Sequence, residues 1–239
     1  IRRQRQMCIR DRKSIAQSEL DRKRFVYSDI GFILLQQVVE AVTGKTLDAY
    51  LVSEFYRPMG LEHTLFQPLN RYKKADIMPT AANDYLRRQD LCGYVYDEAA
   101  AFMGGVSGNA GLFSTAQELG KIYQMILNEG ELDGKRYLRP ETCRIFTTEK
   151  SAVSHRGLGY DKPNLKDPKA NACASSAPAS VYGHTGFTGT CAWVDPENDL
   201  VYIFLSNRLC PDAWNGKLNS MKIRQAVQEV IYQSLYTPE

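Results

Sequence analysis

The stretch 182–190 constrains the fold more than any other part of the chain, because glycine recurs in it directly before two runs of strand-forming residues. Its glycines are Gly183, Gly186 and Gly189. A glycine inside a strand leaves no side chain to pack, so it marks a bulge or a place where another backbone or a ligand comes close. The runs 191–194 and 200–205 are joined by the turn-rich segment 195–199. The pattern predicts a β-hairpin and a close neighbour for the segment that enters it.

Length and composition are those of an ordinary soluble globular protein. The chain has 239 residues, of which 44% are hydrophobic and 24% charged, enough for one large domain or two small ones. Its net charge is +3, and much of the basic excess lies in residues 1–24, so the rest of the chain carries no charge pattern typical of nucleic-acid binding. The sequence contains no window of about 18 apolar residues that could form a membrane-spanning helix.

The cysteines are widely spaced and form no C-x-x-C or Cys/His cluster of the kind that holds zinc. We therefore expect neither a metal site nor another cofactor. Their spacing is compatible with buried thiols and with one or two disulfides. The six residues are Cys8, Cys92, Cys143, Cys173, Cys191 and Cys210.

The first residues of the chain show no apolar periodicity and no hydrophobic core of a signal peptide. A basic arm for an anionic partner is one interpretation of this segment. The run Met-Cys-Ile-Arg-Asp-Arg at 7–12 instead resembles a translated adaptor sequence. We therefore predict that residues 1–19 are a non-native or disordered leader and that the folded domain occupies 20–239.

Apolar residues after position 29 follow the i, i+3, i+4 spacing of a helix buried on one side. Ser28 or Asp29 can cap its start, and Gly44 ends it. A second helix is predicted from Leu47 to about Phe55. The apolar positions of the first helix are Ile30, Ile33, Leu34, Val38, Val39 and Val42.

The glycine-rich segment 103–114 predicts tight turns that a substrate or a neighbouring helix can approach. Two overlapping capping boxes, at 114–117 and 115–118, then predict a helix that ends near Gly130. A short helix is expected after Pro140, a strand at 156–160 and a long surface loop at 161–180. The last helix, predicted to lie across the sheet, has its apolar stripe at Ile223, Ala226, Val227, Val230 and Ile231.

Two short motifs and their flanks resemble the β-lactamase, penicillin-binding-protein and class C-like esterase family of serine hydrolases. His184-Thr185-Gly186 is similar to the third signature of that family, and Tyr27-Ser28-Asp29 to the second. They are separated by 184 − 27 = 157 residues, which suits the family. The flanking runs at 42–47 and 57–61 and the glycine-rich segment 103–114 also resemble family sequences.

The resemblance implies roles for particular residues. Tyr27 would share the proton transfers with the lysine of a Ser-x-x-Lys motif. Asp29 would orient that lysine, unless it only caps the helix. His184 would polarise Tyr27 or bind a substrate carboxylate, unless it is a surface residue. The backbone N–H of Phe187 would be an oxyanion donor. The remaining residues expected at the oxyanion and substrate-binding region are Thr185, Gly186 and Asn109.

One part of the family machinery is absent, because no serine of this sequence has lysine three residues on. In the family that motif precedes the tyrosine motif, so we expect it upstream of Ile1. The resemblance then implies an N-terminally incomplete α/β (α+β) fold of the β-lactamase type. We expect a mainly helical region at 20–140, and an antiparallel sheet with a C-terminal helix at 141–239. Some apolar sheet surface or an open edge should be left uncovered.

The function implied by the resemblance is hydrolysis of an acyl substrate through an acyl-enzyme, in a periplasmic or secreted protein. The substrate could be a β-lactam, an ester or a D-alanyl peptide. The chain itself is expected to be inactive without its nucleophile. The alternatives are a non-catalytic ligand-binding or peptidoglycan-binding domain of the same fold, and a structural module with no cleft between Tyr27 and His184.

Overall fold

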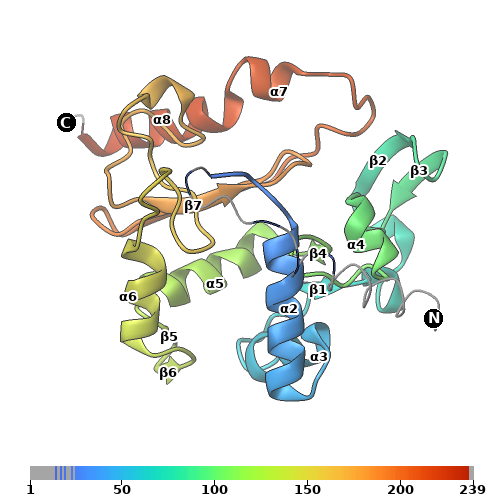
Figure 1. The fold of residues 1–239 in the computed structure, drawn as a ribbon. Helices are drawn as coiled ribbons and strands as arrows, with labels where there is room; N and C mark the ends of the chain where they lie inside the picture. Colours follow the sequence, from blue (N-terminus) through green and yellow to red (C-terminus); the bar gives the residue numbers. More distant parts are fainter. Residues whose placement is uncertain (1–13, 15–16, 18, 20–22, 24, 237–239) are drawn as a thin grey trace.

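The computed structural model describes residues 14, 17, 19, 23 and 25–236, so the predicted leader lies almost entirely outside the described residues. A central antiparallel sheet has helix α8 (Ile223–Tyr236) on one face and helix α5 (Ala116–Leu127) on the other (Figure 1). The family-like arrangement of helices beside an antiparallel sheet is therefore present.

The sheet consists of β7 (Tyr182–Thr185), β8 (Cys191–Asp195) and β9 (Leu200–Phe204), in that order. The predicted hairpin is β8 and β9, paired with Trp193 opposite Tyr202. β7 pairs with β8, with His184 opposite Ala192. A side chain at Gly183 would overlap the backbone of β8, so the close neighbour predicted for this segment is a strand of the sheet.

Helix α8 packs on the sheet face that carries Trp193 and Tyr202. The Tyr202 hydroxyl donates to the Arg224 carbonyl at 2.9 Å, and buried Tyr232 donates to Asp195 Oδ2 at 2.8 Å. The prediction that α8 lies across the sheet is confirmed, but the predicted stripe is partly wrong. Its members Ala226, Val227 and Val230 are exposed, because the buried face uses the polar side chains Gln228 and Tyr232, whose polar atoms find partners.

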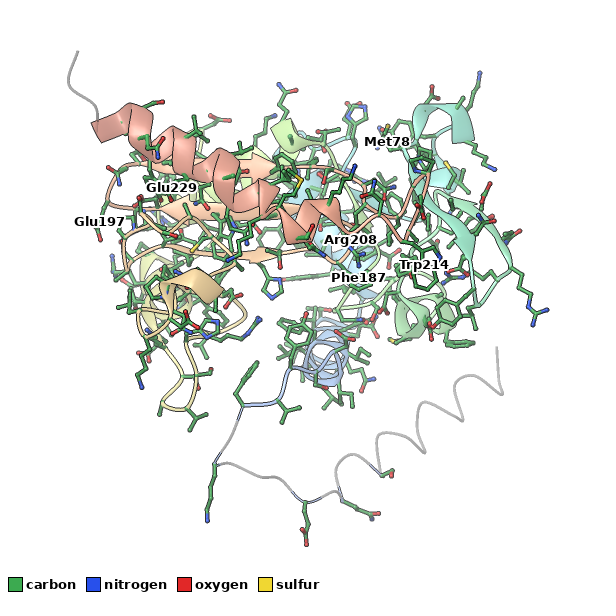
Figure 2. The ribbon with its side chains drawn as sticks, turned by 90° about the horizontal axis from the view of Figure 1, so that it is seen from above. Met78, Phe187, Glu197, Arg208, Trp214 and Glu229 are labelled. Atoms are coloured by element: carbon green, nitrogen blue, oxygen red, sulfur yellow. The ribbon has the colours of Figure 1, made fainter. Side chains whose placement is uncertain are left out.

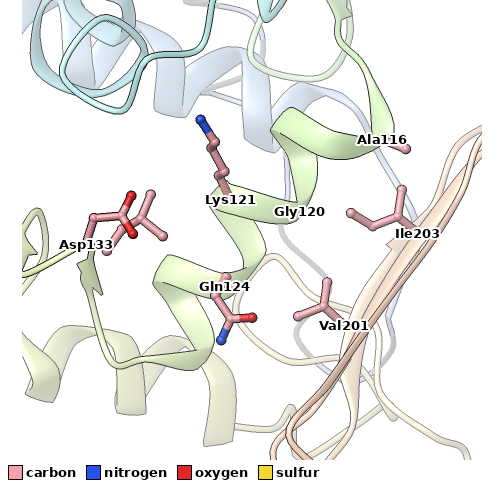
Figure 3. A pocket seen from close by; sticks show the side chains of 8 residues that line it. Ala116, Gly120, Lys121, Gln124, Asp133, Val201 and Ile203 are labelled. Carbon is pink, nitrogen blue, oxygen red and sulfur yellow. The ribbon is translucent and has the colours of Figure 1, made fainter.

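Helix α5 contacts the opposite sheet face at β9, on the side of Val201 and Ile203. Beside this contact, residues of α5 and β9 line a hollow of about 500 Å³ (Figure 3). Thr115 caps α5 by accepting from the Glu118 N–H at 3.3 Å, so the helix begins where the second capping box predicts, but only this half of the box forms.

The helical region begins with α2 (Ile30–Thr43), which ends at Gly44 in the left-handed conformation, as predicted. The Ser28 hydroxyl accepts from the Ile30 N–H at 3.2 Å, whereas the Asp29 side chain makes no capping bond. The predicted second helix is α3 (Leu47–Leu51) followed by a π-helical turn, Val52–Tyr56. Several apolar side chains of α2 stay exposed, so α2 is less buried than its pattern predicts.

Short elements complete the described part of the chain. The helix predicted after Pro140 is α6 (Pro140–Thr148), and the other short helices are α4 (Glu98–Phe102) and α7 (Lys217–Ser220). Three two-stranded sheets pair β1 (Leu65–Phe66) with β4 (Leu112–Phe113), β2 (Pro79–Asp84) with β3 (Gln89–Cys92), and β5 (Glu131–Leu132) with β6 (Lys135–Arg136). Single 3-10 turns lie at Pro68–Asn70, Lys74–Asp76 and Pro168–Ala170.

Two predictions about the region before β7 are wrong. Residues 156–160 form an irregular turn, with Gly159 in the left-handed region, and only Asp161 pairs with the sheet, through Gly183. The segment 161–180 is irregular but is not simply a surface loop, because Cys173 and Ala174 are buried in the core beneath α8. Its small residues allow this close packing. The described cysteines are all free thiols.

Candidate active site

His184 points from β7 into a group of charged and aromatic side chains. Its Nε2 lies 3.0 Å from Arg156 Nη1, and its Nδ1 lies 2.7 Å from the carbonyl oxygen of Thr185. A guanidinium has only donors, so Nε2 must accept the Arg156 bond and Nδ1 must carry the proton that is donated to Thr185. Both contacts are satisfied by one neutral tautomer of His184.

Tyr27 precedes α2 and lies beside His184. The two ring centroids are 6.3 Å apart and the rings are inclined by 29°. Arg156 Cζ lies 5.0 Å from the centre of the Tyr27 ring and 5.4 Å from that of Phe25. Tyr27 remains 58% exposed. The second and third sequence motifs thus meet at one place, as the family resemblance implies.

Arg156 joins these two motifs, although the sequence did not single it out. Its Nη2 lies 3.4 Å from Asp161 Oδ2. His155 Nε2 lies 2.9 Å from the other oxygen of Asp161, but the two atoms are not aligned for a hydrogen bond. Asp161 is buried and exchanges two backbone hydrogen bonds with Gly183, of 2.7 and 3.1 Å. Arg156 is therefore held next to His184 by a backbone bridge one residue away on β7.

A signal for Arg156 existed in the sequence but was weak. The run Arg156-Gly157-Leu158-Gly159-Tyr160 has two glycines in three positions, a spacing more typical of a turn than of a strand. A cation beside such a turn is the signal that could have identified Arg156.

The turn 186–190, which follows His184 and Thr185, is tightly closed. Gly186 N–H donates to the Thr190 carbonyl at 2.7 Å, and Gly189 N–H donates to the Gly186 carbonyl at 3.1 Å. Phe187 at its tip is 64% exposed and stacks on Tyr96, with ring centroids 5.5 Å apart. Arg208 Cζ lies 4.1 Å from the centre of the Phe187 ring, and Figure 2 shows the two residues side by side.

The structure joins neither Asp29 nor Asn109 to this group through a described contact. Asn109 Nδ2 donates to Asp97 Oδ1 at 3.1 Å, and its Oδ1 accepts from the Ser107 hydroxyl at 2.6 Å. The glycine-rich loop that carries Asn109 packs on α2, where Gly108 N–H donates to Gln36 Oε1 at 3.0 Å. The loop therefore lies against a helix, one of the two neighbours expected for it. Substrate binding by Asn109 stays a prediction.

In the described part of the chain, no group of three or more His, Cys, Asp or Glu side chains is arranged to hold a metal ion. None of the described helices combines the length and apolar composition needed to cross a membrane. Two hollows lie elsewhere, one at α5 and β9 and the other, of about 970 Å³, beside β2 and β3. The group around Tyr27 and His184 is identified by the contacts between its side chains.

Comparison with known proteins finds a matching family model and relatives of similar sequence. The family model described as Beta-lactamase matches residues 10–225. A relative from Escherichia coli (strain K12), named "Putative D-alanyl-D-alanine carboxypeptidase", is 37% identical over 197 residues, which cover 77% of this chain and 45% of the relative. The chain thus spans about half the length of the curated relatives it matches.

Solved structures share the fold at low sequence identity. A beta-lactamase from Mycobacterium bovis aligns with a TM-score of 0.60 and 19% identity, over 89% of this chain and 65% of that protein. An octameric penicillin-binding protein homologue from Pyrococcus abyssi aligns with a TM-score of 0.57 and 18% identity, over 91% of this chain and 47% of the homologue. Both are mixed helix and sheet proteins that share this fold.

Proposed function

Because the chain belongs to the beta-lactamase family, we propose that it is part of a serine hydrolase that acts on an acyl substrate through an acyl-enzyme. The convergence of Tyr27, His184 and Arg156 carries this proposal. An acyl transfer needs a nucleophile, a group that moves its proton, and donors for the developing oxyanion. This chain offers candidates for the second and third, and we propose that a serine outside the chain supplies the first.

The contacts support a different role for each residue of the site. Tyr27 would move the proton, and Arg156 is the cation next to its ring. A neutral His184 whose Nε2 accepts from Arg156 offers no free donor to a substrate carboxylate. Of the two roles left open for His184, contact with Tyr27 is therefore favoured. Asp29 at the start of α2 would orient the lysine that accompanies the serine, and the Phe187 N–H would bind the oxyanion.

The substrate class is proposed from the relatives. One is named for D-alanyl-D-alanine carboxypeptidase activity, which supports a peptide ending in D-alanine as the first substrate to test. Such a substrate would place the protein in the periplasm or at the cell envelope. A β-lactam or a small ester would react by the same mechanism and form its own acyl-enzyme on the same serine.

The test compares this chain with the full-length protein that contains it. Both are incubated with a fluorophosphonate probe, a chromogenic ester, a β-lactam and a D-alanyl-D-alanine peptide. We expect the full-length protein to be labelled at a serine and to turn over at least one substrate. The rate of this chain should be lower by several orders of magnitude, because loss of the nucleophile leaves only binding and oxyanion stabilisation.

Two results would contradict the proposal. Labelling of this chain at one of its own serines, with turnover near that of the full-length protein, would place the nucleophile inside it. A full-length protein that is inert to every acyl substrate but binds peptidoglycan fragments would make the domain a binding module.

A further inference from the structure

We infer that Arg224 on α8 is a positioning residue that sets the direction of the Phe187 N–H, an inference that rests on the proposed function of that N–H as oxyanion donor. Arg224 Nη1 lies 3.3 Å from the Gly186 carbonyl oxygen and 2.9 Å from that of Thr190. Its Nη2 donates to Asn219 Oδ1 at 3.0 Å. One guanidinium therefore holds both ends of the turn 186–190.

The geometry of the peptide bond connects this contact to the N–H. The Gly186 carbonyl and the Phe187 N–H belong to one planar trans peptide unit, in which the two groups point in opposite directions. The Gly186 carbonyl accepts from both Arg224 and the Gly189 N–H. Fixing the carbonyl from the side of α8 directs the N–H away from α8.

The strand register places the proposed site on that other side. Residues opposite one another in neighbouring strands share a face, so Thr185, Cys191 and Phe204 form one row across the sheet. Cys191 and Phe204 belong to the core that packs beneath α8. His184 alternates with Thr185 and so lies on the opposite face. The Phe187 N–H is thus directed toward the face of His184 and Tyr27.

Arg208 fixes the next peptide unit in the same turn. Its N–H donates to the Thr188 carbonyl at 2.8 Å, its Nε donates to the Phe187 carbonyl at 2.6 Å, and its guanidinium covers the Phe187 ring. The peptide units on both sides of Phe187 are therefore held by arginines, one in the segment after β9 and one on α8. Only the Gly186 unit, held by Arg224, contains the N–H that the reaction would use.

The test uses Arg224→Gln and Arg224→Lys in the full-length protein. Loss of an oxyanion donor lowers kcat by about 100- to 1,000-fold, so a donor that is present but poorly directed should cost less, about 10- to 100-fold. We expect that fall in kcat with KM nearly unchanged, because the oxyanion forms only in the transition state. Arg224→Lys should keep part of kcat, since an ammonium can hold one of the two carbonyls.

A matched control separates positioning from docking of α8. Tyr202→Phe removes the hydrogen bond between β9 and the Arg224 carbonyl but leaves the guanidinium contacts. It should lower stability and preserve kcat. A readout independent of activity is the ¹³C resonance of the Gly186 carbonyl, which should move in Arg224→Gln and stay in place in Tyr202→Phe. If Arg224→Gln does not fold, kcat and the ¹³C resonance of the Gly186 carbonyl are measured in Arg224→Lys instead.

The inference is overturned if kcat is unchanged in both Arg224 variants, or if Tyr202→Phe lowers kcat as much as Arg224→Gln. It is also overturned if the Gly186 resonance does not respond to Arg224. A full-length protein without acyl-transfer activity would refute the proposed function instead, and the carbonyl resonance would then decide the positioning alone.

Discussion

Arg156 contacts more of the candidate site than any residue that the sequence motifs name. It donates to His184, faces the rings of Tyr27 and Phe25, and pairs with Asp161. A planar guanidinium can make these contacts together, whereas an ammonium is a compact point charge. The arrangement therefore depends on arginine specifically.

Arg156→Lys in the full-length protein should lower kcat/KM by about 10- to 100-fold, because a charge-assisted hydrogen bond contributes roughly 1.5–3 kcal/mol. Steady-state kinetics with a chromogenic ester measures the change. Arg144→Gln, which removes an exposed cation paired with Glu129, is the control and should leave kcat/KM unchanged. An equal kcat/KM for Arg156→Lys and the original protein would show that the reaction does not depend on arginine at position 156.

Two thiols in the core should make the free energy of unfolding depend on pH in the alkaline range. Burial raises the pKa of Cys173 to about 12 and that of Cys191 to about 11, from 9.0. A raised folded pKa means that the stabilisation is complete below the unfolded value and is lost as pH rises through the folded value. The free energy of unfolding should therefore fall from about pH 9 upward. Urea unfolding at pH 7 to 11 measures this, and Cys191→Ala should flatten the slope; an equal slope in that variant would assign it to other groups.

At the scale of elements, Glu118 ties α5 to the segment 62–64. Its carboxylate accepts from the Glu62 and His63 N–H groups, both at 2.9 Å, and from the Thr64 hydroxyl at 2.6 Å. A capping box would send this carboxylate back to the start of its own helix. Here it joins two parts of the chain that are more than fifty residues apart.

Glu118→Gln should destabilise the fold by about 1–3 kcal/mol, since it weakens several hydrogen bonds to a charged acceptor. Burial acts to raise the pKa of Glu118, but the bonds from Thr64, His63 and Glu62 lower it overall, below 4.5. A lowered folded pKa gives stabilisation that is present above the unfolded value and lost as pH falls through the folded value. Unfolding curves from pH 6 to pH 3 should therefore converge for Glu118→Gln and the original chain. Glu62→Gln, at an exposed side chain, should stay within about 0.5 kcal/mol of the original.

Local signals predicted those elements whose ends and faces are specified nearby in the sequence. Gly44 ends α2, Thr115 begins α5, and the turn at 195–199 joins β8 and β9, because caps and turns act within a few residues. The position of Arg156 depends on a bridge from Asp161 to Gly183, twenty-two residues away. No local pattern encodes such a contact. The predicted face of α8 is partly wrong for a related reason, since buried Gln228 accepts from the Ala174 N–H, fifty-four residues away.

At the scale of the whole molecule, apolar side chains remain exposed on two helices. On α2, Leu35, Val38 and Val42 are 58%, 55% and 80% exposed, and on α8, Val230 is 59% exposed. β9 is an outer strand of the described sheet, beside the hollow at α5. Uncovered apolar surface and an outer strand both favour association.

This 239-residue chain, purified alone, should therefore bind a hydrophobic dye and elute from size exclusion as a self-associated species. Val38→Lys combined with Val42→Lys should reduce both signals, because these exposed apolar side chains would be replaced by charged ones. Arg144→Gln again serves as the control and should change neither signal. A monomer that unfolds in one cooperative transition and binds no dye would contradict the expectation.

The contacts between β2 and the segment after β9 also set the order in which the chain can finish folding. Asn207 Nδ2 donates to the Thr80 carbonyl at 3.1 Å across 127 residues, and Ala82 N–H donates to the Leu209 carbonyl at 2.9 Å. At a synthesis rate of roughly 5–20 residues per second, Thr80 leaves the ribosome's catalytic centre roughly 6–25 s before Asn207 is made. Throughout that interval the β2–β3 hairpin lacks these two contacts, and an unpaired strand edge favours association with other chains.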